Sequence, residues 1–173
     1  MKDTPPFFFA PGTTMPAGHQ HLIRVAAAED LDALQALARR TIDACYRAFL
    51  GDEAVDWFLD SGASDAHVKT YLEQGKVYHL SHDGQIAGVS ILDGPTIDVM
   101  MIDPDHHRRG LGRALLRHAE STLFAHHAAI RLESFAGNTA ANSFYEACGW
   151  SPGRRLEAEG PAKVEYTKHR RMD

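Results

Sequence analysis

The sequence has few cysteines and no long apolar segment. Only Cys45 and Cys148 occur among 173 residues, and a chain of this length buries a core large enough to do without disulfide bonds. We therefore expect two free thiols in a reducing compartment, the cytoplasm. No apolar run approaches the roughly 20 residues that span a bilayer, so no membrane partner is expected. Residues 1–20 contain one short apolar run, FFFA, with prolines on both sides of it. This pattern predicts a flexible leader rather than a secretory signal.

The chain also lacks an excess of positive charge. It has 18 Lys and Arg against 23 Asp and Glu, a formal net charge of −5. Proteins that bind nucleic acid irrespective of its sequence present a basic surface, so no nucleic-acid partner is expected. The balance suits a cationic or amine-bearing substrate, although a modest negative charge is also ordinary for a soluble protein.

Two common phosphate-binding motifs are missing. The pattern G-x-x-x-x-G-K-[ST] is absent, and no G-x-G-x-x-G follows the first strand, which excludes P-loop hydrolases and dinucleotide-binding folds. The chain instead has PDHHRRGLGRALL at residues 104–116, directly after an apolar strand at 96–103. Unpaired N–H groups at the start of a helix attract anions, and glycines there allow close approach. The segment predicts a pyrophosphate site; a glycine-rich turn with solvent-facing arginines is the alternative.

The hydrophobic periodicity predicts a mixed α/β domain. The order is one strand, three helices, three strands, a helix, a strand, a helix and a closing hairpin. Strands are expected at 22–26, twice within 76–94 around an Asp83-Gly84 turn, at 96–103, 129–135, 153–160 and 162–168. Helices are expected at 28–50, 52–62, 65–75 with Ser64 as cap, 110–124 and 138–149.

The motifs together resemble the GCN5-related N-acetyltransferase (GNAT) superfamily. Its signature [QR]-x-x-G-x-[GA], after an apolar strand and a proline, is matched except that His107 replaces Gln or Arg. A second signature, N-x-x-A-x-x-[FL]-Y-x-x-x-G-[FW], is matched by Asn138, Ala141, Phe144, Tyr145, Gly149 and Trp150. The resemblance implies one GNAT domain over residues 21–170. Its mixed sheet of about six or seven strands is splayed between the fourth and fifth strands, with helices on both faces.

The resemblance also implies acetyl-CoA as acetyl donor and no metal. The pantetheine arm is expected along Met100, Met101 and Ile102, where a strand N–H polarises the thioester carbonyl. The diphosphate is expected on main-chain N–H groups of His107, Arg108, Arg109, Gly110, Leu111, Gly112 and Arg113. Asn138 is expected to cap its helix and to bind the pantetheine arm. Adjacent histidines, at 106–107 and 126–127, rarely provide convergent metal-binding geometry.

For catalysis, the resemblance assigns Tyr145 as the acid that protonates the leaving thiolate; packing beside Phe144 is the alternative. The base that deprotonates the amine is less clearly indicated. Asp98 is a candidate because it alternates with Met100 and Ile102 along one strand face. Glu133 on the neighbouring strand is a second candidate, and a chain of water molecules is a third.

The acceptor is expected to be a primary amine of a small molecule or peptide, attacked directly in a ternary complex. The resemblance directs attention to Tyr46, Phe49, Trp57, Phe58 and the segment 151–163, beside the acidic Asp52, Glu53 and Asp56. An inactive GNAT-like domain that binds acyl-CoA as a sensor is the alternative. A toxin that acetylates aminoacyl-tRNA is disfavoured by the negative charge. The expected state is a monomer or homodimer.

Overall fold

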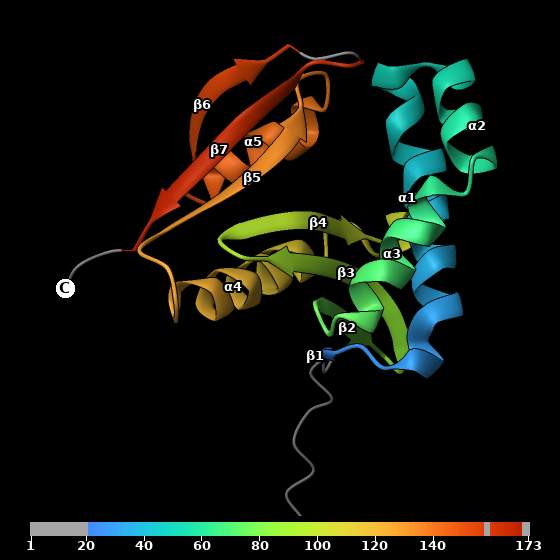
Figure 1. Cartoon of the computed structure of the whole chain (residues 1–173), viewed down its shortest axis with the longest axis horizontal. Coiled ribbons are helices and arrows are strands. Elements are labelled where there is room, and N and C mark those ends of the chain that lie inside the picture. The colour runs from blue at the N-terminus through green and yellow to red at the C-terminus, as the bar shows by residue number, and fades with distance from the viewer. Residues whose placement is uncertain (1–20, 158–159, 171–173) are drawn as a thin grey trace, which may run out of the picture.

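A computed structural model of the chain describes residues 21–157 and 160–170 (Figure 1). The predicted leader, residues 1–20, lies outside the described residues. The strands are β1 (His21–Val25), β2 (Val77–His82), β3 (Gln85–Asp93), β4 (Thr96–Ile102), β5 (Ala129–Phe135), β6 (Ser151–Leu156) and β7 (Lys163–His169). The helices are α1 (Leu31–Leu50), α2 (Asp52–Asp60), α3 (Ala63–Glu73), α4 (Leu111–Phe124) and α5 (Thr139–Ala147).

The predicted order of helices and strands is confirmed. Several boundaries differ. The helix α3 begins at Ala63 after a left-handed Gly62, which places Ser64 inside the helix rather than at its cap, and β6 runs over Ser151–Leu156 rather than 153–160. No helix in the described part of the chain is both long and apolar enough to cross a membrane.

All strands belong to one seven-stranded sheet in the order β1-β2-β3-β4-β5-β7-β6. Among the strands of residues 21–157 and 160–170, only the β4–β5 pair is parallel, and its pairing is confined to Thr96 with Arg131 and Ile97 with Leu132. Beyond Ile97 the two strands separate, while β5 pairs with β7 along its whole length. The predicted splay between the fourth and fifth strands is therefore confirmed. Figure 1 shows β1–β4 and β5–β7 diverging from this point.

Helices cover both faces of the sheet, as predicted. On one face, Leu34 and Leu37 of α1 and Val68 of α3 pack against β2 and β3. On the other face, α4 directs Leu111, Leu115 and Leu116 at the sheet, and α5 adds Tyr145. The apolar residues of α4 recur at steps of three and four, so a single stripe of the helix is buried.

β4 contains a bulge close to the point where β5 leaves it. Along the β3–β4 ladder, Ile91 pairs with Val99 and Leu92 pairs with Ile97, so Asp98 has no partner of its own. One extra residue in a strand shifts the alternation of side chains by one position.

The bulge overturns one prediction about Asp98. Met100 and Ile102 pack on the α4 face, whereas Val99 and Met101 pack on the α1 and α3 face. Asp98 contacts α3, so it lies on the face opposite Met100 and Ile102. The expectation of a shared face assumed unbroken alternation and is wrong.

We predict that Gly88→Ala destabilises the protein and that Ile102→Val relieves the effect. A Cβ on Gly88 lies 2.6 Å from Cδ1 of Ile102, its partner on β4. Overpacking of this kind costs about 1–3 kcal/mol of unfolding free energy. Ile102→Val removes Cδ1, and by itself costs about 0.5–1.5 kcal/mol.

Urea unfolding of the single and double variants provides the measurement. The loss of unfolding free energy in the double variant is expected to be smaller than the sum of the losses in the two single variants. Strictly additive losses contradict the contact.

Candidate active site

A cavity of about 350 Å³ opens where β4 and β5 separate. Residues of β4, β5 and α5 form one part of its wall, and residues of α1, α2 and α3 form the other. Among the sequence-predicted residues, the wall includes Asp98, Met100, Met101, Asn138 and Tyr145. Segments far apart in the sequence thus meet at one opening, as the motifs predict.

Ile102 is not among the residues that line this cavity. Its side chain packs with Leu111 and Leu115 beneath α4. Leu111 is itself buried, so only its main chain is available to a ligand.

Tyr145 combines packing with access to the cavity. The residue is 8% exposed, and its ring packs against Phe144, Trp150 and Tyr166. Burial, with smaller contributions from Tyr46 and Cys148, raises the pKa of the Tyr145 hydroxyl, so the phenol stays protonated at neutral pH. Among the described residues this hydroxyl has no hydrogen-bond partner, which leaves it able to donate to a ligand.

Asn138 caps α5, as predicted. Its side-chain oxygen accepts a hydrogen bond from the N–H of Ala141 at 3.2 Å. The residue also lines the cavity, so capping fixes a polar side chain at the wall.

The turn before α4 presents a row of N–H donors. Arg108 and Gly110 both adopt left-handed backbone conformations, with φ of 60° and 78°. Within the described part of the chain, the N–H groups of residues 108–113 find no protein acceptor, and the first helical bond here is from Ala114 to the Gly110 carbonyl. Consecutive unpaired N–H groups at a helix N-terminus form an anion-binding concavity.

His107 takes a different part from the one expected. Its N–H donates to the Pro104 carbonyl at 3.3 Å, so the row of free donors starts one residue later, at Arg108. Its Nε2 lies 2.8 Å from the carbonyl oxygen of Ile102. The imidazole therefore connects the turn to the end of β4.

Asp103 attaches the same turn to α1. Its buried carboxylate accepts hydrogen bonds from the Arg40 guanidinium, and also from the N–H of Asp105 at 3.0 Å. Burial alone would raise the pKa of Asp103, but the bonds from Arg40 and Asp105 outweigh it, so the pKa is lowered. The carboxylate stays ionised at neutral pH and holds the turn in place.

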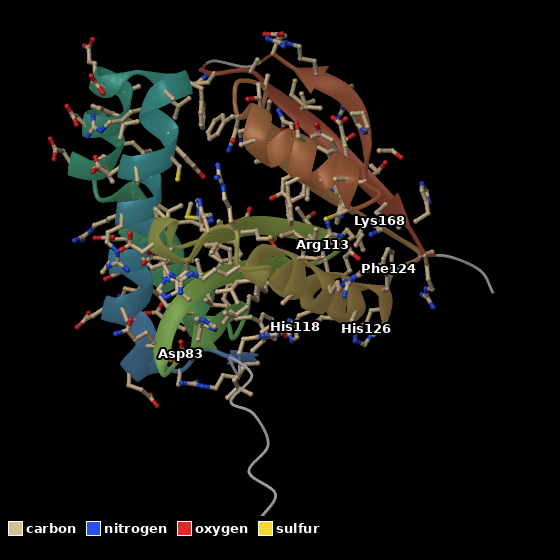
Figure 2. The ribbon with its side chains drawn as sticks, turned by 180° about the vertical axis from the view of Figure 1, so that it is seen from behind. Asp83, Arg113, His118, Phe124, His126 and Lys168 are labelled. Atoms are coloured by element: carbon tan, nitrogen blue, oxygen red, sulfur yellow. The ribbon has the colours of Figure 1, made fainter. Side chains whose placement is uncertain are left out.

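Positive charge surrounds the start of α4. Arg108, Arg109 and Arg113 are exposed, and no ion pair or hydrogen bond engages their guanidinium groups within the described residues. Arg113 and Arg117 border a second cavity of about 340 Å³, beside Lys168 of β7 (Figure 2). Lys168 is already paired with Glu120 at 2.8 Å, so the arginines are the cations available to an anion.

The predicted acceptor residues divide into two groups. Tyr46 and Phe58 line the cavity, and burial raises the pKa of Tyr46 to about 12. Phe49 packs behind them against Phe135, and Trp57 is 70% exposed away from the wall. Of the segment 151–163, only Lys163 reaches the wall among the residues described.

The acidic charge of α2 is partly neutralised, which the sequence pattern did not indicate. The Arg47 guanidinium binds Asp43, Asp52 and Asp56 at 2.6, 3.3 and 2.7 Å. Glu53 has no such partner in the described residues. The attraction of this wall for a cation is therefore weaker than the count of carboxylates suggests.

His67 is a cavity residue that sequence reasoning missed. Its Nε2 lies 2.6 Å from Oδ2 of Asp98, and both residues line the wall. Glu133, the second candidate base, also lines the wall and pairs with Lys163 at 3.3 Å. No signal in the sequence joins His67 to Asp98, because they come from different elements.

Cys45 and Cys148 are free thiols. In the ranges 21–157 and 160–170, no three His, Cys, Asp or Glu side chains gather in a way that could hold a metal ion.

Comparison with known families and proteins gives a consistent result. The model of the acetyltransferase (GNAT) family matches residues 32–150. The [ribosomal protein bS18]-alanine N-acetyltransferase of Escherichia coli K12 is 31% identical over 126 residues, 70% of this chain and 82% of that protein. The peptidyl-lysine N-acetyltransferase YiaC of the same organism is 32% identical over 81 residues, 46% of this chain and 53% of that protein.

Solved structures share the fold. A GCN5-related N-acetyltransferase from Rhodopseudomonas palustris has a TM-score of 0.77 and 19% identity, covering 91% of this chain and 99% of that one. The PaiA N-acetyltransferase of Thermoplasma acidophilum, solved in complex with coenzyme A, has a TM-score of 0.72 and 17% identity, covering 84% and 98%.

We predict opposite effects of an added methyl group at the two glycines of the turn. Gly110→Ala is expected to destabilise the protein by about 1 kcal/mol, because an L-residue is disfavoured in the left-handed region. Gly112→Ala is expected to stabilise it by about 0.5–1 kcal/mol through helix propensity. Its Cβ meets Ile102 and Phe144 only at 3.7 Å, an ordinary contact.

Thermal unfolding of the unliganded variants measures both effects. A loss of stability in Gly112→Ala as large as that in Gly110→Ala contradicts this description of the turn.

Proposed function

Because the chain belongs to the acetyltransferase (GNAT) family, we propose that it transfers the acetyl group of acetyl-CoA to a primary amine of a peptide or small molecule. The amine attacks the thioester directly while both substrates are bound. The observation that supports this most is the row of unpaired N–H groups at residues 108–113, next to the cavity between β4 and β5.

In this proposal the turn binds the diphosphate of acetyl-CoA. N–H groups of Arg108, Arg109, Gly110, Leu111, Gly112 and Arg113 donate to phosphate oxygens, and the three guanidinium groups add charge-assisted hydrogen bonds. His107 shapes the turn through its bond to the Ile102 carbonyl.

β4 binds the pantetheine arm. Past Ile97, β4 has lost β5 as its neighbour, so its main chain around Met100, Met101 and Ile102, apart from the Ile102 carbonyl that His107 engages, is available for hydrogen bonds on that side. The side chain of Asn138 lies on the same wall and contacts the arm. One strand N–H in this stretch stabilises the negative oxygen of the tetrahedral intermediate.

Two proton movements complete the reaction. Tyr145 donates its hydroxyl proton to the sulfur of the departing thiolate, a role consistent with its raised pKa and its place on the wall. Asp98 takes part in removing a proton from the acceptor ammonium. Glu133 is less suited, because Lys163 already engages its carboxylate.

A peptide amine is the acceptor that the relatives favour. One relative is named for acetylating the alanine of a ribosomal protein and another for acetylating peptidyl lysine. Tyr46 of α1 and Phe58 of α2 supply an aromatic part of the wall for the acceptor.

The experiment has two stages. Isothermal titration with acetyl-CoA tests binding, and release of free CoA is then followed with a peptide bearing an N-terminal alanine, an N-blocked peptide with one lysine, and spermidine. Binding followed by amine-dependent release supports the proposal. Absence of binding overturns it, and binding without release from any amine indicates a non-catalytic acyl-CoA-binding domain.

We predict that Tyr145→Phe lowers kcat by about 100-fold, the lower end of the usual range for general acid catalysis. The dissociation constant of acetyl-CoA is expected to stay within about twofold, because the aromatic packing is kept. Steady-state kinetics and calorimetry provide the two measurements.

Tyr166→Phe is the matched control. Its hydroxyl donates to Glu146 at 3.1 Å, away from the cavity wall, so kcat is expected to be unchanged. Equal kcat values for wild type and Tyr145→Phe would show that the Tyr145 hydroxyl is not the acid.

A further inference from the structure

A histidine and a carboxylate form a hydrogen-bonded pair on the cavity wall. His67 comes from α3 and Asp98 from the bulge of β4, and Nε2 of the histidine lies 2.6 Å from Oδ2 of the aspartate. The two side chains are 42% and 31% exposed, so a ligand in the cavity can reach the imidazole.

The carboxylate determines which nitrogen of His67 holds the hydrogen. An ionised carboxylate only accepts hydrogen bonds, so Nε2 must donate in this pair. In the neutral ring Nδ1 then has the free lone pair. No donor among the described residues bonds to Nδ1, which leaves an imidazole base available to the cavity.

The bulge sets the pair apart from the rest of the strand. Ile97 packs on the α4 face, so Asp98, the next residue, faces α3, and the extra residue then returns Met100 to the α4 face. Bulges commonly redirect a side chain beside an active site. Here the bulge also lies directly after Ile97, the last residue of β4 that pairs with β5.

Other titratable groups face the same cavity from several elements. Tyr46 comes from α1 and Tyr145 from α5, while Glu133 of β5 and Lys163 of β7 pair with each other. On α3 itself, the Tyr71 ring lies 4.8 Å from the His67 ring and its hydroxyl donates to Asp93 at 3.4 Å.

Neutral imidazole is a much stronger base than a carboxylate, so it is better matched to an ammonium near neutral pH.

We propose that His67 is the catalytic base that accepts a proton from the acceptor ammonium, and that Asp98 is the positioning residue that fixes its tautomer. The inference rests on the acetyl transfer proposed above. The N–H bond of the ammonium breaks, and its proton moves to Nδ1 of His67. The amine lone pair then forms the C–N bond while the carbonyl π electrons move to oxygen, and the C–S bond breaks when this tetrahedral intermediate collapses.

The protons balance over the whole reaction. The thiolate takes the proton of Tyr145, and the phenolate is restored by the second proton of the nitrogen as the amide forms. His67 releases its proton to solvent, so one proton leaves for each acetyl group transferred.

The test compares pH profiles of kcat/KM for wild type and His67→Gln, with the N-terminal alanine peptide as acceptor. His67→Gln is expected to lower kcat/KM about tenfold at pH 7, because only about a tenth of an α-amino group with a pKa near 8 is then free amine. The loss is expected to disappear about one pH unit higher, where free amine replaces the missing base. The dissociation constant of acetyl-CoA is expected to be unchanged.

Asp98→Asn and His126→Gln complete the series. Asp98→Asn is expected to lower kcat/KM less than His67→Gln does. His126 is exposed at the far end of α4 (Figure 2), so the same chemical change there is expected to leave the profile unaltered.

Nitrogen-15 NMR of the histidine side chains gives a readout independent of turnover. His67 is expected to be the Nε2–H tautomer in wild type, and a mixture of tautomers in Asp98→Asn.

A His67→Gln profile that parallels wild type within about twofold overturns the base assignment while acetyl transfer stands. An Nδ1–H tautomer in wild type also overturns it. A wild type that binds acetyl-CoA but acetylates none of the three amines overturns the proposed function, and the proton-transfer role with it.

Discussion

The structure depends on the early separation of β4 and β5. The two strands pair only through Thr96 and Ile97, after which β5 continues with β7 as its full-length neighbour. A sheet that stayed paired would satisfy its own backbone groups and leave no room between the strands. The separation instead exposes the main chain of β4 and opens a cavity to which six elements and β7 contribute side chains.

The separated edge is useful only because the segment after β4 is held firmly. Asp103 connects this segment to α1 through Arg40, and His107 connects it back to the Ile102 carbonyl. These two contacts support a turn in which a non-glycine residue, Arg108, takes a left-handed conformation. Such conformations persist where surrounding contacts hold them, and the result is a row of N–H groups without an acceptor among the residues that the structure describes.

Local patterns in the sequence predicted the elements and the turn. The leucines of α4 recur at helical spacing, and Asp83 and Gly84 both have positive φ in the tight turn between β2 and β3. Asn138 caps α5 through its own side chain. Each of these features is decided by residues close in the chain, which is why the sequence alone indicates them. The separation of β4 and β5 was expected only from the family resemblance.

Features decided by contacts between distant segments were not predictable. The bulge at Asp98 depends on how β3 and β4 align, and it places that carboxylate on the face opposite Met100. His67 becomes part of the site only because α3 packs over this strand. Arg47 neutralises carboxylates from two helices, a result that a count of charges cannot give. The proposed base was missed for the same reason.

One consequence follows from the position of α1. Arg40 of this helix donates hydrogen bonds to Asp103, which precedes the turn. Tyr46, less than two helical turns further along α1, lines the wall proposed for the acceptor. A helix transmits displacement as a rigid rod, so an acceptor that moves α1 also moves the turn. Any coupling between the turn and the wall proposed for the acceptor would therefore pass through α1, and thermodynamic reciprocity requires it to act equally in both directions.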